Sequence, residues 1–244
     1  MNLILDFGNT NKKLAVFSKG RLLKLEQHLS IRTGIVREVM RRYPGIHHCI
    51  LASVVNYPVS LRNFLAENFR FFEMDEKTKL PVINKYSTKK TLGKDRIAAA
   101  VAGSNLFPGR DVLVVNAGSC ITYDFVNSHQ EYLGGAISPG LNMRLRALHT
   151  FTDKLPLVNL KRYRGLIGNS TGASIKSGVI NGATAEIEGV AQRYAKEFPG
   201  ITVILSGGDL KYFDKRLKIS IFAIPNIVIH GLSQILEFNV KKAK

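Results

Sequence analysis

The stretch LILDFGNT at residues 3–10 begins with an apolar run, which is followed by an acid, a glycine and two polar side chains. The stretch LVVNAGS at residues 113–119 repeats this arrangement. Aligning residue 6 with residue 116, an offset of 116 − 6 = 110, also brings Val16 onto Val126 in the strand that returns after the turn. Two copies of a strand, a glycine turn and a returning strand predict a duplicated domain with a cleft between its halves, where ligands commonly bind. A chance match is the alternative, because buried strand–turn units share composition.

Outside these two stretches, the spacing of apolar residues alternates between that of strands and that of helices. The pattern predicts strands at 13–18, 21–28, 49–55, 132–137 and 201–205, and helices at 35–40, 61–65, 97–106, 171–198 and 229–236. A further helix is expected to start at Pro139, because proline suits the first helical turn, with Leu141, Leu145 and Leu148 on one face. Strands and helices mixed in this way indicate an α/β fold class.

The composition is that of a globular protein, with 244 residues, 45% hydrophobic and 22% charged. The expected boundary at Pro108-Gly109-Arg110 gives an N-terminal lobe at residues 1–109 and a C-terminal lobe at residues 110–244. No apolar run approaches the roughly 20 residues that cross a bilayer, so no membrane partner is expected. Cys49 and Cys120 lie far apart without metal-ligand spacing, which argues against a disulfide framework or zinc site and favours a cytoplasmic location.

The net charge of +17 is the one unusual feature of the composition. Such a charge attracts anions, including nucleotides, carboxylates and nucleic acid, and it serves solubility equally well. The basic residues are scattered, mostly in pairs, and none of these grows into the run of five or more that is typical of a nucleic-acid-binding arm. Nucleic acid is therefore not expected as a partner, although a basic patch assembled in three dimensions stays open.

The first glycine turn has the side chains of a phosphate-binding segment. Glycine lets backbone N–H groups approach a phosphate closely, and Asn9 and Thr10 add polar side chains. Asp6 could hold Mg²⁺ directly or through water, because this ion prefers oxygen ligands and keeps much of its hydration. Lys12 or Lys13 could reach a terminal phosphate. The alternative is a plain hairpin turn, in which asparagine and glycine are favoured in any case.

A second motif, Gly93-Lys94-Asp95-Arg96, lies where a helix is expected to start. A guanidinium such as that of Arg96 can grip a carboxylate with two hydrogen bonds, while the neighbouring acid accepts a proton from a substrate hydroxyl. Helix capping explains Asp95 equally simply, because an acid near a helix N-terminus is stabilised by the helix dipole. The glycine-rich turns at 134–140 and 206–208 could bring backbone against a nucleotide, and each is a weak signal alone.

In their order and spacing these motifs resemble those of the type III pantothenate kinases, in the superfamily of acetate and sugar kinases, heat-shock ATPases and actin. The resemblance rests on residues 6–10, 93–96, 116–119 with Thr122, 134–155, 168–171 and 206–208. It implies a duplicated ribonuclease-H-like (actin-like ATPase) fold of two lobes with a central nucleotide cleft. It further implies a homodimer that transfers phosphate from ATP to pantothenate, the first step of coenzyme A biosynthesis.

The resemblance also implies roles for individual residues. Asp95 matches the family's catalytic proton acceptor. The pantothenate-binding positions are Tyr86, Gly93, Lys94, Arg96 and Thr171. The ATP-binding positions are Asp6, Phe7, Gly8, Asn9, Thr10, Asn11, Lys12, Lys13 and Ser119. Mg²⁺ is expected near Asp6, and a monovalent cation, K⁺ or NH₄⁺, is expected at Asn116.

Asn116 departs from the family pattern, because the family usually has aspartate at this position. An amide oxygen can still coordinate K⁺, but the lost negative charge puts potassium dependence in doubt. Two other readings stay open. One is a catalytically impaired family member that acts as a nucleic-acid-associated regulatory factor, and the other is a kinase for another small alcohol or acid. Pantothenate kinase activity is favoured, because every other expected catalytic side chain is present.

Overall fold

The computed structural model describes residues 1–160, 163–213 and 215–242, and the chain divides into two compact units. The first unit combines Met1–Leu106 with Ile227–Lys244, and the second is Phe107–Asn226. The first change of unit therefore lies close to the expected boundary at 108–110. The end of the chain is grouped differently from the expected C-terminal lobe, because the last helix packs within the first unit.

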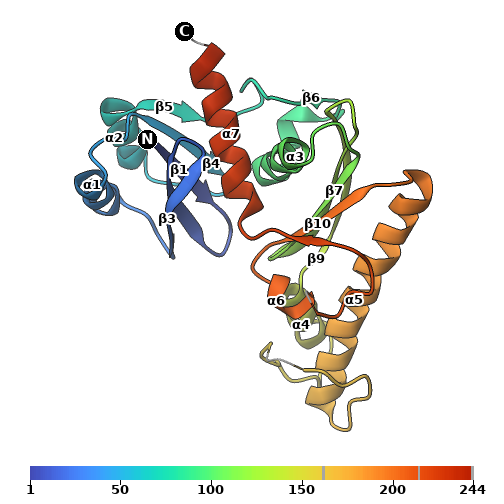
Figure 1. The fold of residues 1–244 in the computed structure, drawn as a ribbon. Helices are drawn as coiled ribbons and strands as arrows, with labels where there is room; N and C mark the ends of the chain where they lie inside the picture. Colours follow the sequence, from blue (N-terminus) through green and yellow to red (C-terminus); the bar gives the residue numbers. More distant parts are fainter. Residues whose placement is uncertain (161–162, 214, 243–244) are drawn as a thin grey trace. The chain divides into compact units, whose positions relative to one another are not determined.

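The first unit is built on a five-stranded sheet with the order β3-β2-β1-β4-β5 (Figure 1). Its strands are β1 (Asn2–Phe7), β2 (Lys12–Ser18), β3 (Arg21–His28), β4 (His48–Ser53) and β5 (Arg70–Glu73). Neighbours β1, β2 and β3 are antiparallel, whereas β4 runs parallel to β1 and to β5. The central strand β1 is covered on both faces, which explains its continuous apolar run through Leu3, Ile4 and Leu5, all fully buried.

Helices cover this sheet and include the last helix of the chain. They are α1 (Thr33–Arg42), α2 (Val59–Asn68), α3 (Lys94–Leu106) and α7 (Ile227–Lys242), with a short strand β6 (Ile83–Asn84) and a 3₁₀ turn η1 (Lys89–Thr91) between α2 and α3. Helix α7 contacts α3, β1 and β4 (Figure 1). Its Gly231 permits a close crossing, because a Cβ there would lie 1.8 Å from the carbonyl oxygen of Ala98.

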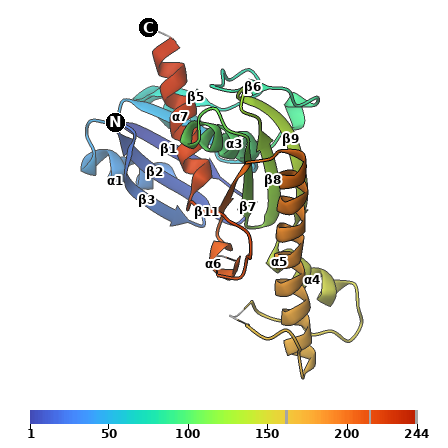
Figure 2. The same ribbon diagram turned by 45° about the vertical axis from the view of Figure 1, so that its right-hand side comes forward.

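The second unit has the strand order β11-β10-β7-β8-β9. Its strands are β7 (Val112–Ala117), β8 (Cys120–Val126), β9 (Glu131–Pro139), β10 (Thr202–Ser206) and β11 (Phe222–Ala223). Its helices are α4 (Leu141–Thr150), α5 (Thr171–Glu197) and α6 (Leu210–Phe213), and α4 packs beside the 27-residue α5 (Figure 2).

The two units repeat one topology. In each, a central strand pairs on one side with an antiparallel hairpin, β2–β3 or β8–β9, and on the other side with two successive parallel strands. The predicted repeat is therefore present in the structure. The alignment of the returning strands was wrong by one residue. Val112 pairs with Val126 and its counterpart Asn2 pairs with Phe17, so Val126 corresponds to Phe17 and not to Val16. Four residues separate the paired Phe7 and Lys12, and three separate Ala117 and Ile121, so the second turn is one residue shorter.

The expected helix start at Pro139 is wrong. Pro139 is the last residue of β9 and pairs with Cys120, and Gly140 caps α4 with extended backbone angles (φ −69°, ψ 171°). The sheet pairing continues to the end of the strand and so delays the helix by two residues. On α4, Leu141 and Leu145 are buried as expected, whereas Leu148 is exposed. Within the described parts of the chain, no helix has the length and apolarity that crossing a membrane requires.

Candidate active site

The first predicted phosphate-binding segment places a carboxylate beside an ammonium group. Asp6 is directly opposite Lys13 in the β1–β2 pairing, and both side chains are partly buried. Burial raises the pKa of Asp6 to about 6, an effect that Lys13 opposes and Asp95 reinforces. Burial also lowers the pKa of Lys13, and Asp6 opposes that shift. Two charges that burial disfavours in this way are typical of functional sites.

The turn between these strands is tight. The Gly8 N–H donates to the carbonyl oxygen of Asn11 at 3.1 Å, and a Cβ at Gly8 would lie 3.2 Å from that same oxygen. The ammonium group of Lys12 donates to the carbonyl oxygen of Gly8 at 2.9 Å. Lys12 therefore stabilises the turn, and Lys13 is the lysine beside the acid. Asn9 and Thr10, the predicted phosphate contacts, are exposed at its tip.

The second predicted motif begins α3. The Oδ1 atom of Asp95 accepts a hydrogen bond from the N–H of Arg96 at 2.9 Å, and a Cβ at Gly93 would lie 2.6 Å from that oxygen. The carboxylate thus folds back over Gly93, where a side chain would displace it. The Arg96 side chain is buried, with its Cζ atom 5.7 Å from the centre of the Tyr86 ring. Tyr86, the predicted pantothenate contact ten residues upstream, therefore lies against the motif.

These two motifs meet within the first unit. Asp95 is close enough to Asp6 for its negative charge to raise the pKa of that carboxyl. The predicted proton acceptor and the predicted magnesium-binding acid thus belong to one electrostatic cluster with Lys13. Like charges held this close favour a bound cation or a shared proton.

In the second unit, the turn after β7 brings together three of the predicted small-residue motifs, at residues 116–119, 134–140 and 206–208. Asn116 is opposite Thr122 on β8 and opposite the buried Ser206 on β10. Gly207 follows with φ 102°, and a Cβ there would lie 2.0 Å from the carbonyl oxygen of Ala117. The 206–208 turn therefore lies against the end of β7, where a side chain would not fit.

The third of these motifs contacts the turn at Ser119. The Gly140 N–H donates to the carbonyl oxygen of Ser119 at 3.2 Å, and a Cβ at Gly140 would lie 2.1 Å from the carbonyl oxygen of Gly118. Ser119 itself is exposed. Thr171, the remaining predicted pantothenate contact, is exposed as the first residue of α5, after the cap residue Ser170.

Sequence analysis missed two acids of the second unit. Asp124 is completely buried, and its carboxylate accepts hydrogen bonds from Thr122 Oγ1 and from the hydroxyl of Tyr132, each at 2.9 Å. Two polar residues at alternate positions of an apolar strand could have signalled this cluster. Asp209 follows the 206–208 turn, and burial raises its pKa to about 6. Because its neighbours along the chain are glycine and leucine, the sequence carries little sign of this shift.

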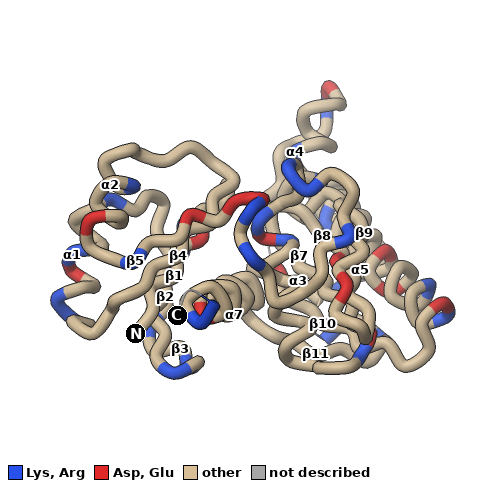
Figure 3. Tube along the Cα trace, turned by 90° about the horizontal axis from the view of Figure 1, so that it is seen from above, with Lys and Arg blue, Asp and Glu red and all other residues tan. Residues whose placement is uncertain are grey.

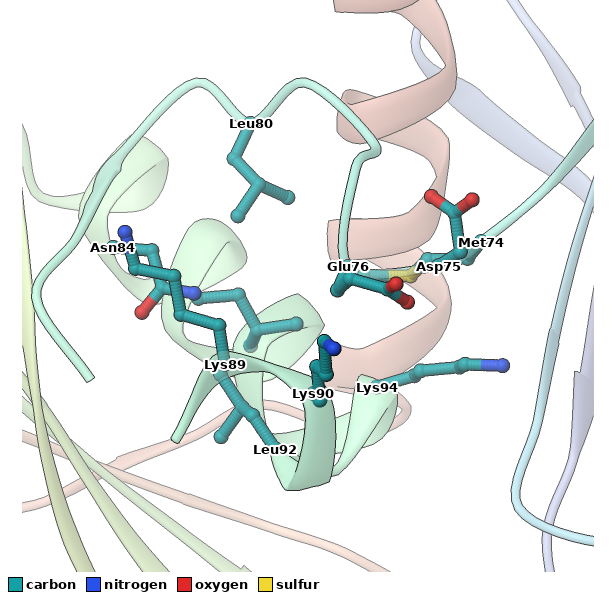
Figure 4. Close-up of a pocket in the computed structure, with 10 residues that line it drawn as sticks. Met74, Asp75, Glu76, Leu80, Asn84, Lys89, Lys90, Leu92 and Lys94 are labelled. Atoms are coloured by element: carbon teal, nitrogen blue, oxygen red, sulfur yellow. The ribbon is translucent and has the colours of Figure 1, made fainter. Parts of the chain in front are cut away.

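A pocket in the first unit lies beside the start of α3, and its lining includes Lys94, a predicted pantothenate contact (Figure 4). Its charged lining consists of Lys89, Lys90 and Lys94 with Asp75 and Glu76, over apolar side chains. The predicted catalytic acid and the neighbouring arginine are not among its lining residues. Elsewhere, Lys and Arg are spread over elements of both units (Figure 3), in keeping with the scattered basic pairs of the sequence.

Solved structures place this fold in a known class. A conserved Campylobacter jejuni protein, described as a Baf family transcriptional activator, superposes with a TM-score of 0.58 at 20% identity and covers 98% of this chain and 99% of that one. A glucokinase from an Antarctic psychrotroph gives a TM-score of 0.51 at 13% identity over 97% and 98% of the two chains. The protein thus has the duplicated ribonuclease-H-like fold of sugar kinases and actin-like ATPases, as predicted.

Sequence comparison supplies the narrower assignment. The type III pantothenate kinase family matches residues 2–193. A type III pantothenate kinase from Christiangramia forsetii is 44% identical over 242 residues, which are 98% of this chain and 99% of that protein. The chain belongs to the type III pantothenate kinase family and is therefore an enzyme. The alternative of a regulatory factor gains no support, because the 20% likeness to the Campylobacter jejuni protein concerns the fold alone.

The raised pKa of Asp6 predicts a stability cost that grows between about pH 4 and pH 6 and is present in full above pH 6. In the unfolded chain this carboxyl ionises at its ordinary pKa near 3.8, so its charge destabilises the fold increasingly as the pH rises from about 4 to above 6. Asp6→Asn should therefore raise the free energy of unfolding at pH 7.5 by about 1 to 3 kcal/mol, since one pKa unit corresponds to about 1.4 kcal/mol. Thermal unfolding at pH 7.5 and pH 5 measures this, and the gain should shrink at the lower pH.

Glu67→Gln, at an exposed acid on α2 of the same unit, is the matched control. It should leave stability unchanged at both values of the pH. An Asp6→Asn protein that is no more stable than the wild type at pH 7.5 would show that burial imposes no net cost on the Asp6 charge.

Proposed function

We propose that this protein transfers the γ-phosphate of ATP to the primary hydroxyl of pantothenate, which forms 4′-phosphopantothenate and begins coenzyme A biosynthesis. Membership of the type III pantothenate kinase family supports the reaction. The observation that carries the assignment of residues is the cluster of Asp6, Lys13 and Asp95 within one unit, with Arg96 against Tyr86.

Asp95 is the proposed proton acceptor. The hydrogen bond from the Arg96 N–H fixes the orientation of its carboxylate, and Gly93, which has no side chain, leaves room for it. A fixed carboxylate can align the hydroxyl with the γ-phosphate and take its proton late, as the bond from phosphorus to the leaving oxygen breaks. A weak base is sufficient, because positioning and charge neutralisation supply most of the rate of phosphoryl transfer.

Arg96 is proposed to bind the carboxylate of pantothenate. Its buried guanidinium lies against the Tyr86 ring, and such an arrangement limits the orientations in which the side chain can meet an anion. Gly93, Lys94 and Thr171 complete the proposed pantothenate contacts, of which the first two lie on the same turn as Asp95.

ATP is proposed to bind along residues 6–13 and at Ser119. The tight backbone at Gly8 and the exposed Asn9 and Thr10 suit a phosphate, and Lys13 supplies a positive charge beside Asp6. Asp6 fits Mg²⁺, because one partly buried carboxylate beside a second acid attracts a cation that keeps most of its water. The bound ion would offset the charge of the phosphate oxygens, and Asp6 would hold it through water.

Asp95→Asn should lower kcat by about 10²-fold or more while ATP binding stays measurable, because the amide cannot accept the hydroxyl proton. ADP release with pantothenate as acceptor measures turnover, and calorimetry with a non-hydrolysable ATP analogue measures binding. Asp75→Asn removes an exposed acid of the same unit and serves as the control. Near-normal turnover of Asp95→Asn would remove Asp95 from the role of base, whereas a wild type that does not phosphorylate pantothenate would overturn the proposed reaction.

Asn116 is the proposed ligand of the monovalent cation. Asn116 lies near the end of β7, opposite the hydroxyl-bearing Thr122 and Ser206, and these three side chains offer oxygen atoms without a negative charge of their own. Asn116→Asp should therefore lower the K⁺ or NH₄⁺ concentration that half-activates the enzyme, by about tenfold, since a nearby charge in a partly buried site is worth more than 1 kcal/mol. ADP release across a KCl series measures this, with Asn142→Asp on α4 as the control. An unchanged KCl dependence would contradict the assignment.

We further propose that the enzyme works as a cytoplasmic homodimer. The second unit exposes large apolar side chains that a monomer would leave in water, including Phe151 at 84%, Leu166 at 79% and Ile167 at 85%. Exposed apolar groups of this kind favour association. Sedimentation equilibrium should give twice the 27.1 kDa mass of one chain, and Phe151→Glu combined with Ile167→Glu should weaken the dimer. A wild type that sediments as a single chain would contradict this proposal.

A further inference from the structure

In the second unit, the guanidinium of Arg144 links the end of β9 and the helices α4 and α5. The Nε atom of Arg144, on α4, donates to the carbonyl oxygen of Pro139 at 2.8 Å, and Nη2 donates to Ser138 Oγ at 2.8 Å. The same Nη2 donates to the carboxylate of Glu186 on α5. The other oxygen of Glu186 accepts from the hydroxyl of Tyr123 on β8 at 2.9 Å.

The ion pair is protected from water and remains charged at neutral pH. The side chains of Arg144 and Glu186 are 23% and 28% exposed. Burial would raise the pKa of Glu186, but hydrogen bonds from Arg144, Ser138 and Tyr123 lower it below its ordinary value. A partly buried pair with further hydrogen bonds to both partners is more rigid than a surface ion pair.

The strand end that Arg144 holds lies directly on the proposed nucleotide turn. Pro139 pairs with Cys120, the Gly140 N–H donates to the carbonyl oxygen of Ser119, and Gly140 has no room for a side chain against Gly118. A shift of the backbone at 138–140 would therefore move the backbone at 118–119. Arg144 binds the carbonyl oxygen of Pro139, one residue before Gly140, which contacts the turn.

We propose that Arg144 and Glu186 are positioning residues for ATP, which hold the strand end at 138–140 so that the Gly118–Ser119 turn meets the nucleotide. The proposal rests on the proposed function, in which Ser119 contacts ATP. Neither side chain needs to touch the substrate. Their removal should weaken the use of ATP more than that of pantothenate, because the turn next to the held strand end carries the proposed ATP contact Ser119 and no proposed pantothenate contact.

Arg144→Met tests this proposal. The KM for ATP should rise by about tenfold or more, because small displacements of positioning groups are costly, while the KM for pantothenate should change less than about twofold. Arg144→Lys should recover only part of the effect, because one ammonium group cannot reproduce the planar fork of donors. Arg146→Met removes an exposed arginine from the same helix and should leave both KM values unchanged.

A uniform loss would overturn the positioning role. If Arg144→Met raised both KM values equally, or changed neither while lowering the melting temperature, the pair would be merely structural. If that variant did not fold, Glu186→Gln decides by the same comparison, since it keeps the size of the side chain and removes the charge that holds Arg144. Wild-type turnover of pantothenate is measured alongside, and its absence would refute the proposed function rather than this proposal.

Discussion

A strand that is covered on both faces carries an unpaired polar side chain at least cost near its end, where it leaves the core, and this constraint sets the position of the candidate site. Leu3 to Leu5 are fully buried in β1, and the polar Asp6 follows them, one residue before the end of the strand. In the other unit, Val112 to Val115 are fully buried in β7, and Asn116 follows them. The returning hairpin strand then brings one partner beside each polar residue. The burial of a central strand thus decides where the chemistry of each unit can be.

The two units use the same geometry with different electrostatics. Asp6 is opposite Lys13, whereas Asn116 is opposite Thr122, so one turn carries a pair of opposite charges and its counterpart carries an amide and a hydroxyl. Burial disfavours both charges of the first pair, so this pair costs stability, as charged groups of functional sites often do. The neutral pair is suited to polar contacts and to a weakly held cation. In the proposed function, duplication followed by divergence would give ATP one charged and one neutral contact.

The sequence was sufficient to predict the repeat and the α/β class, whereas the roles of the residues in the two motifs of the first unit stay predictions. Apolar spacing shows strands and helices directly, and the neighbourhood of Asp95, Arg96 and Gly93 is local along the chain. Features that depend on contacts between residues far apart in the sequence could not be predicted in this way. The packing of α7 with the first unit, the extended Pro139 and the bonds of Asp124 with Tyr132 all follow from sheet pairing or helix crossing. Local propensity carries no information on these pairings.

The crossing of α7 over α3 at Gly231 has a consequence for how the protein comes into being. A ribosome delivers Ala98 more than a hundred residues before the segment that covers it, with the whole second unit in between. Until the last helix emerges, the alanine-rich surface of the nascent first unit stays exposed to water and to other chains, while the intervening unit can already assemble. Completion of the first unit must therefore await the synthesis of residues 227–242, and a chain truncated near residue 226 would leave this surface open.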